Sequence, residues 1–268
     1  MNSSKPSLTT IILTHTRIEL LKRALRSLEG QDSVQIHLII MIDDCFLTSR
    51  FMETLPTFGS PIRSLRWFYF KRGLNEFSGP KRVATLRNLA LPKIETEWCS
   101  YLDDDNELEP EHFSTLFESV MRYRSPATHS WRSIWTKSGR PFKIRGRHPW
   151  SNDKDLATRL FVQYRDAGIY QTGSNIIRDK VVPLSRNESM VDMSEWFFST
   201  EFIRGIGFVE DYSLEDRISS RTEDSKLLDE IVKRNIKIPS TQKPTLRYYM
   251  GGYSNDWSNE ASQIEAWL

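Results

Sequence analysis

The feature that most constrains this chain is an alternation of short apolar runs with amphipathic stretches. Residues 8–14 form a strand-length run of apolar and β-branched side chains, and residues 36–42 form a second, continuously apolar run. Between them, the apolar side chains of residues 17–29 recur at helical spacing, and Gly30 follows as a stop. A strand, a helix and a strand in this order are typical of a βαβ unit, which predicts an α/β fold with a mainly parallel central sheet flanked by helices.

The same alternation returns farther along the chain. Residues 67–70 form a short aromatic run, residues 80–91 carry a helical apolar face, and residues 98–102 form another strand-length run. The second strand of each unit ends in acids, Asp43 with Asp44 in the first and residues 103–105 in the second. Ligands of open α/β sheets bind beyond the carboxyl ends of the strands, so we expect a site between these two groups of acids.

The second half of the chain follows a looser pattern. No linker or repeat divides the chain, so we expect a single domain over residues 1–268 whose less regular half begins near residue 126. The expected elements are a helix after residue 110, a hairpin of residues 130–137 and 141–145, and helices over residues 193–204, 210–220 and 225–235.

Composition excludes several classes of protein. Lys and Arg number 37 against 35 Asp and Glu, a formal net charge of +2, which argues against a strongly cationic nucleic-acid binder. No apolar run approaches the roughly 18 residues that would span a bilayer, and residues 1–7 are polar. Cys45 and Cys99 each adjoin a hydrophobic run, which favours buried thiols over a disulfide or a metal site. We therefore expect a cytoplasmic protein.

The strongest candidate for chemistry is the acidic run of residues 103–111, which holds six carboxylates. Three consecutive aspartates directly after a buried strand repel one another unless a cation or hydrogen-bond donors offset their charge. Oxygen ligands select Mg²⁺ or Mn²⁺, which complete their coordination with substrate phosphates and water. The run predicts a site for a divalent metal and a diphosphate; the alternative is a solvated loop whose acids favour the start of the next helix.

Five segments in order resemble the family 2 glycosyltransferases, which have the GT-A fold. They are residues 11–17, residues 42–44, Gly79 and Pro80 with residues 87–90, residues 101–106, and residues 209–217. The resemblance implies a nucleotide-sugar-binding half over about residues 1–125 and an acceptor-binding half over about residues 126–268. It implies a hexosyltransferase-like activity of the kind used in polysaccharide biosynthesis. A sugar would pass with inversion from a nucleotide-diphosphate sugar, UDP-linked, to a saccharide or other hydroxyl acceptor, with Mn²⁺ or Mg²⁺ as cofactor.

The resemblance also assigns roles to single residues. Those assigned to the nucleotide are Thr14, Arg17, Asp44, Arg87, Asp103 and Asp104. Thr14 and Asp44 would contact the nucleoside, and Asp103 or Asp104 would lie near the ribose. Asp105, the last acid of the DXD motif, would bind the metal. Arg87 would lie near the diphosphate or hold the acidic loop. The alternatives are a capped turn at Asp44 and an ordinary surface charge at Arg87.

The general base falls in the fifth segment. Inverting transfer needs one carboxylate that removes the acceptor's proton while the diphosphate leaves from the opposite face. The resemblance assigns this role to Asp211, with Glu210 as the fallback. The alternative is an acidic pair that complements the dipole of a helix beginning there.

Two departures from the family pattern affect the site. All five histidines lie within the first 148 residues, so the histidine that often assists the metal or diphosphate in the C-terminal part is missing. Residues 247–254 stand there instead, and Tyr248, Tyr249 or Ser254 would approach the diphosphate, unless the metal rests on Asp105, phosphates and water alone. His15 and Thr16 replace the usual aromatic residue and asparagine after the first strand.

Two further groups have open interpretations. The basic residues of 137–148 predict either a solvated hairpin or a flap that binds a diphosphate or a phosphorylated acceptor, and peripheral membrane contact is a further possibility. Four tryptophans, Trp131, Trp135, Trp150 and Trp196, either line a sugar cleft or belong to the core or an interface. The oligomeric state is left open.

Two rival functions remain open. A sugar nucleotidyltransferase would also combine a nucleotide-binding βαβ unit with metal-binding acids, although no Gly-rich, basic triphosphate loop follows the first strand. A binding module of the same fold would have kept the nucleotide site and lost turnover.

Overall fold

The computed structural model describes residues 5–55, 58–74, 79–181, 190–218 and 221–252. The strands in these ranges are β1 (Ser7–Thr14), β2 (Gln35–Asp43), β3 (Ile62–Phe70), β4 (Trp98–Tyr101), β5 (Glu107–Leu108), β6 (Ala127–Trp135), β7 (Ile176–Ile177), β8 (Trp196–Ser199) and β9 (Ser240–Tyr249). The α-helices are α1 (Ile18–Glu29), α2 (Phe46–Glu53), α3 (Pro80–Ala90), α4 (His112–Tyr123), α5 (Lys154–Asp166), α6 (Thr200–Ile206), α7 (Leu214–Ile218) and α8 (Glu223–Lys233), with short 3₁₀ turns at η1 (Leu91–Lys93) and η3 (Met193–Glu195).

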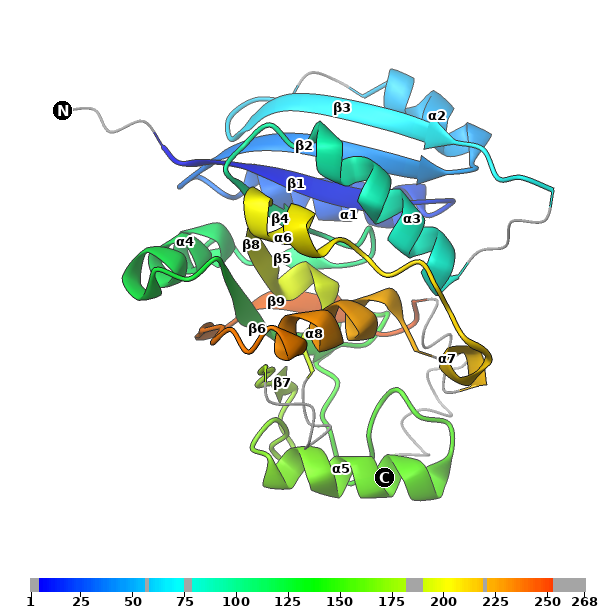
Figure 1. The fold of residues 1–268 in the computed structure, drawn as a ribbon, viewed down its shortest axis with the longest axis vertical. Helices are drawn as coiled ribbons and strands as arrows, with labels where there is room; N and C mark the ends of the chain where they lie inside the picture. The colour runs from blue at the N-terminus through cyan, green and yellow to red at the C-terminus, as the bar shows by residue number, and fades with distance from the viewer. Residues whose placement is uncertain (1–4, 56–57, 75–78, 182–189, 219–220, 253–268) are drawn as a thin grey trace.

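One sheet runs through both halves of the described chain. Its strand order is β3-β2-β1-β4-β8-β6-β9-β5, with β7 beside β6 (Figure 1). The first four strands pair in parallel, and β8 is antiparallel to both β4 and β6. Two antiparallel pairings in succession give β6 the direction of the first four strands. The strand β9 has the same direction, because it is parallel to β6. The expected α/β fold with a mainly parallel sheet is confirmed.

The sheet is covered by apolar side chains on both faces. In β2, Leu38, Ile40 and Ile42 pack with the core under α1 and α4, whereas Ile39 and Met41 pack with the core under α3, α6 and α8. Figure 1 shows α3, α6 and α8 in front of the sheet and α1 behind it. A strand buried on both faces has no polar side to expose, which is why this run is apolar without alternation.

A third core lies at the far end of the sheet, where α5 packs. It includes Phe142 and Ile144 from the basic segment, together with Phe161 of α5. These two side chains anchor the segment, while its basic residues Lys143 and Arg145 are exposed. The expected hairpin is wrong in its second strand, because residues 141–145 make a single bridge to β6 and then leave it.

The helix expected over residues 193–204 is also wrong. Residues 196–199 form β8, which inserts between β4 and β6, and the helix α6 begins only after it. Phe197 packs on one face of the sheet, and Trp196 and Phe198 pack on the other. Three consecutive aromatic side chains buried on two faces fit a strand, because a helix would direct all three around one turn. Trp196 is therefore core and lines no sugar cleft.

The remaining expectations for helices hold in part. The helix expected over residues 225–235 is α8, which begins two residues earlier. The one expected over residues 210–220 is reduced to the short α7. Cys45 and Cys99 are both free and buried, as expected. Within the described residues, no helix is both long enough and apolar enough to cross a membrane.

Candidate active site

The acidic loop, residues 103–105, follows β4 and meets the end of the neighbouring strand β1. Asp104 is 1% exposed and accepts a hydrogen bond of 2.7 Å from the Thr14 hydroxyl. Arg17, in the turn between β1 and α1, donates through Nη2 to Asp104 and through Nη1 to Asp105. Pairing of β1 with β4 therefore brings together four of the residues assigned to the nucleotide and the metal.

Burial is the main influence on the acids of this loop. Burial raises the pKa of Asp105 to about 6; the Arg17 guanidinium lowers it, and the charges of Asp104 and Asp192 raise it again. Burial likewise raises the pKa of Asp103 and of Asp104, against the pull of the neighbouring guanidinium groups. The loop thus places three carboxylates against two guanidinium groups, Arg17 and Arg87, and a bound cation would offset the remaining negative charge.

Arg87 joins the acidic loop to α8. It is 3% exposed, and its Nη2 lies 3.3 Å from Asp103 Oδ1 and 3.2 Å from Glu223 Oε1. The interpretation of Arg87 as a surface charge is wrong, because this side chain of α3 is buried, with its guanidinium carbon 5.5 Å from the centre of the Tyr101 ring and 5.6 Å from that of Phe208. Burial raises the pKa of Glu223 to about 7, with Arg87 opposing the shift.

The backbone of the loop is fixed from the other half of the chain. The Ser194 hydroxyl, in η3, accepts from the Asp103 amide at 3.1 Å and from Asn106 Nδ2 at 3.3 Å. The side-chain oxygen of Asn106 in turn accepts from the Tyr249 amide of β9. The turn η3 and the strand β9 therefore hold the backbone of the loop and the following Asn106 in place.

Asp43 and Asp44, at the end of β2, have different surroundings. Burial acts to raise the pKa of Asp43, but hydrogen bonds from Arg72 and Arg82 outweigh it and hold that pKa below its ordinary value. Asp44 has a left-handed backbone, with a φ of 49°, and accepts from the Tyr69 hydroxyl at 2.9 Å. Asp43 thus binds two arginines. Asp44, just beyond the carboxyl end of β2, binds no arginine among these and is the better placed of the two to meet a ligand.

The two candidates for the base differ in how far they are engaged. Glu210 accepts hydrogen bonds from the Thr85 hydroxyl at 2.7 Å and from Asn88 Nδ2 at 2.6 Å, which tie it to α3. The Asp211 side chain is exposed, and its backbone oxygen accepts from Lys226 Nζ at 2.6 Å.

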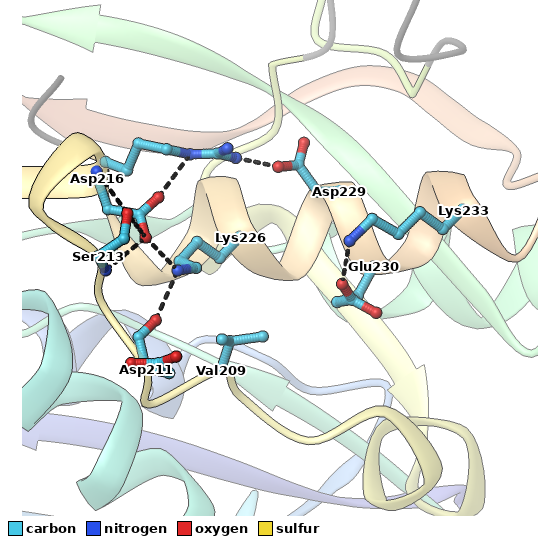
Figure 2. A pocket seen from close by; sticks show the side chains of 9 residues that line it. Val209, Asp211, Ser213, Asp216, Lys226, Asp229, Glu230 and Lys233 are labelled. Atoms are coloured by element: carbon cyan, nitrogen blue, oxygen red, sulfur yellow. Dashed lines mark hydrogen bonds and ion pairs between the residues drawn. The ribbon is translucent and has the colours of Figure 1, made fainter.

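Asp211 lines a pocket of about 330 Å³ beside α8. Figure 2 shows Lys226, on α8, reaching across this pocket to both Asp211 and Asp216. Its wall is polar, and its charged side chains pair with one another, Lys226 with Asp216, Arg221 with Asp229 and Lys233 with Glu230.

Residues that the sequence did not single out complete the acidic cluster. Glu223 and Asp224 open α8, and Asp192 and Ser194 belong to η3 and its start. The charge of Asp224 acts on Asp103, and the charge of Asp192 acts on Asp105. The sequence signal for Glu223 and Asp224 was Thr222 followed by two acids, a pattern typical of a helix start. It lies two residues before the start of the helix expected over residues 225–235.

The carboxylates of the acidic loop could bind a hard divalent cation only if phosphate oxygens of a ligand supplied further coordination. Asp105 is 15% exposed and Asp103 is 33% exposed, whereas Asp104 is enclosed and hydrogen-bonded. Among the described residues, no three His, Cys, Asp or Glu side chains gather in a geometry that could hold a metal. Mg²⁺ and its relatives commonly use one or two carboxylates and complete their shell with phosphate oxygens.

The two tyrosines near the end of β9 are committed to other partners. Tyr248 is buried and accepts from Trp150 Nε1 at 3.3 Å. The Tyr249 hydroxyl donates to Glu107 at 2.8 Å, and its ring carries the guanidinium of Arg23 at 3.7 Å. Ser254, the third candidate from this region, lies outside the described residues.

In sequence comparisons, no family model and no curated protein matches this chain. In structure it is similar to S. aureus TarS. The structural alignment with TarS 1–349 in complex with UDP-GlcNAc covers 91% of this chain and 58% of the TarS chain, with a TM-score of 0.55 at 14% sequence identity. The complex of the same TarS segment with UDP matches 91% and 60%, with a TM-score of 0.52 at 13% identity. This chain spans about 60% of the length of these TarS structures, and the likeness establishes a shared fold.

Proposed function

We propose that this protein is a family 2-type inverting glycosyltransferase. It transfers a sugar from a UDP-sugar to an acceptor hydroxyl with the help of Mn²⁺ or Mg²⁺. The observation that carries the proposal is the acidic loop, in which Thr14 and Arg17 hold Asp104, Arg17 also reaches the partly exposed Asp105, and Arg87 lies beside Asp103. The shared fold with TarS, whose structures hold UDP-GlcNAc and UDP, supports a nucleotide-sugar donor.

The nucleotide would lie across the carboxyl ends of β2, β1 and β4. Asp44, at the end of β2, accepts from the base, and Asp103 is the acid with room to meet the ribose, because Asp104 is enclosed. Asp105 would hold the divalent cation together with the diphosphate oxygens. When bound, that cation stabilises the charge that develops on the leaving diphosphate.

The base would act from the opposite side of the sugar. Asp211 is exposed, lines a polar pocket that an acceptor could enter, and has a carboxylate that can remove the acceptor's proton. Glu210 is the weaker candidate because Thr85 and Asn88 already engage its carboxylate.

Asp224 is the alternative base. Its charge acts on Asp103 and on Arg87, so this carboxylate lies within electrostatic reach of the expected diphosphate. One oxygen of Asp224 accepts hydrogen bonds from the Thr222 hydroxyl and the Ser225 amide, and its neighbour Glu223 is paired with Arg87.

The test is release of UDP from a panel of UDP-sugars in the presence of Mn²⁺ and hydroxyl acceptors. We expect Asp211→Asn to lower kcat by about a hundredfold or more with UDP affinity retained. Asp105→Ala should lose donor binding with the fold intact. Asp229→Asn, which changes another carboxylate of the same pocket, is the matched control.

Each result has a distinct meaning. Transfer that survives Asp211→Asn and is lost in Asp224→Asn would move the base to α8. Release of pyrophosphate from a nucleoside triphosphate would indicate a sugar nucleotidyltransferase. Tight UDP binding with neither hydrolysis nor transfer would indicate a binding module.

A further inference from the structure

Arg17 occupies the part of the acidic loop where a cation is expected. Its two terminal nitrogens reach two different carboxylates, Nη2 that of Asp104 and Nη1 that of Asp105. Its side chain is 23% exposed, so the guanidinium lies at the edge of the loop. An arginine of the chain itself therefore offsets the charge of the expected metal ligand.

The two contacts of Arg17 are not equivalent. Asp104 is enclosed and held by the Thr14 hydroxyl, so the contact through Nη2 has a fixed partner. Asp105 lies toward the surface, and Arg17 meets it through the other nitrogen. A rotation of the guanidinium about its contact with Asp104 would release Asp105 and leave the buried carboxylate paired.

The other arginines near the loop are arranged differently. Arg87 is buried between Asp103 and Glu223. Arg23 donates to the backbone oxygen of Asp105, pairs with Glu107 at 3.3 Å and lies on the ring of Tyr249. Each of these two guanidinium groups pairs with a carboxylate outside residues 103–105, Arg87 with Glu223 and Arg23 with Glu107.

We propose that Arg17 is an internal counterion that gives up Asp105 to the divalent cation and turns Nη1 to the donor's diphosphate. This inference rests on the proposed function. A guanidinium fork suits a diphosphate as well as a carboxylate, so the exchange replaces one charge-assisted hydrogen bond by another. A cation alone must compete with Arg17, whereas a cation with a diphosphate offers Arg17 a new partner. Cation and nucleotide binding are therefore coupled through this residue.

The test is Mn²⁺ binding, followed by the electron paramagnetic resonance signal of free Mn²⁺, with and without UDP. We expect Arg17→Met to raise the Mn²⁺ affinity of the nucleotide-free protein about tenfold, the size of one charge-assisted contact. UDP affinity in Mn²⁺, measured by calorimetry, should fall by about the same factor. Arg17→Lys keeps the charge but cannot span both carboxylates. The Mn²⁺ affinity of this variant should therefore lie between those of the wild-type protein and Arg17→Met.

Two controls separate this effect from a general loss of charge. Arg23→Met removes a positive charge from the surroundings of the same loop, yet leaves the Asp105 carboxylate paired, and should change Mn²⁺ affinity by less than about threefold. Asp105→Asn added to Arg17→Met should abolish the gain. Thermal melting of each variant shows that it is folded.

The outcomes distinguish this inference from the proposed function. If wild-type protein binds Mn²⁺ with UDP but Arg17→Met leaves the nucleotide-free affinity unchanged, Arg17 is not the counterion and the function stands. The inference also fails if Arg23→Met has the same effect as Arg17→Met. If wild-type protein binds UDP but no Mn²⁺, the cation part of the proposed function fails as well.

Discussion

Replacing Arg87 by methionine should destabilise the protein in a strongly pH-dependent way. The Arg87 guanidinium is buried and bridges Asp103 to Glu223, at 3.3 Å and 3.2 Å, and so links α3, the acidic loop and α8. At an effective dielectric constant of about 20, each contact would contribute about 5 kcal/mol of attraction, from which desolvation subtracts much. Breaking a buried pair typically costs about 3–5 kcal/mol, and the exposure of Asp103 places this variant near 3 kcal/mol at pH 8.

The pH dependence follows from Glu223. Burial raises its pKa from an ordinary 4.5 to about 7 in the folded protein, so the folded state binds more protons than the unfolded state between these values. Its contribution to stability is therefore greatest below about 4.5 and declines as the pH rises to 7. Without Arg87 the folded pKa rises further and the decline continues past pH 7. At pH 5 Glu223 is already protonated in the folded wild-type protein. We therefore expect Arg87→Met to lower the free energy of unfolding by only about 1 kcal/mol at this pH.

Urea denaturation at pH 5 and at pH 8 measures both free energies of unfolding. The double variant Arg87→Met with Glu223→Gln is the matched control, because a neutral side chain at position 223 should remove most of the difference between the two pH values. An equal cost at pH 5 and pH 8 in the single variant would refute the reasoning. The role assigned to Glu223 would also be wrong if the double variant kept the full pH dependence.

Two further predictions concern a buried ion-pair cluster around Arg132 of β6 and the nucleotide contact assigned to Asp44. Arg132 is buried among carboxylates that include Asp179 and Asp192, whose pKa values burial raises to about 6 against the pull of Arg132. Arg132→Met should therefore cost at least about 3 kcal/mol at pH 8 and clearly less at pH 5 in urea denaturation, and a pH-independent cost would contradict this. Asp44→Ala should lower UDP affinity about tenfold in calorimetry, the loss of one hydrogen bond to a charged group, without changing the thermal midpoint by more than a few degrees. Unchanged UDP affinity would remove Asp44 from the nucleotide site.

Parts of the first half of the fold were predictable because their signals are local, although α2 was not expected and β3 begins at Ile62, five residues before the expected run. The apolar run of β2 and the helical period of α1 are complete within a dozen residues, so pattern and structure agree to within about two residues. The second half failed at β8, whose short aromatic run fits either a strand or a buried helix. Pairing with β4 and β6 decides the matter, and both partners are remote in the sequence.

The candidate site divides in the same way. The acids at the ends of β2 and β4 were visible, because strand ends follow from the pattern. Their partners were not, since nothing in the sequence connects Arg87 with Glu223 or Ser194 with the amide of Asp103. Such contacts depend on how the two halves of the sheet meet.

The charges around the acidic loop also bear on how donor and cation would bind. Asp103, Asp104 and Asp105 face two guanidinium groups, of which that of Arg87 is shared with Glu223. A diphosphate alone would add negative charge to a loop that already has an excess. A dication alone would have to displace Arg17. Bound together the two nearly cancel, and the released guanidinium gains an anionic partner, so the electrostatic cost of either ligand is smallest when both are present. This balance explains how a site with few protein ligands could still hold a metal, because the substrate supplies the charge and the oxygens that the chain lacks.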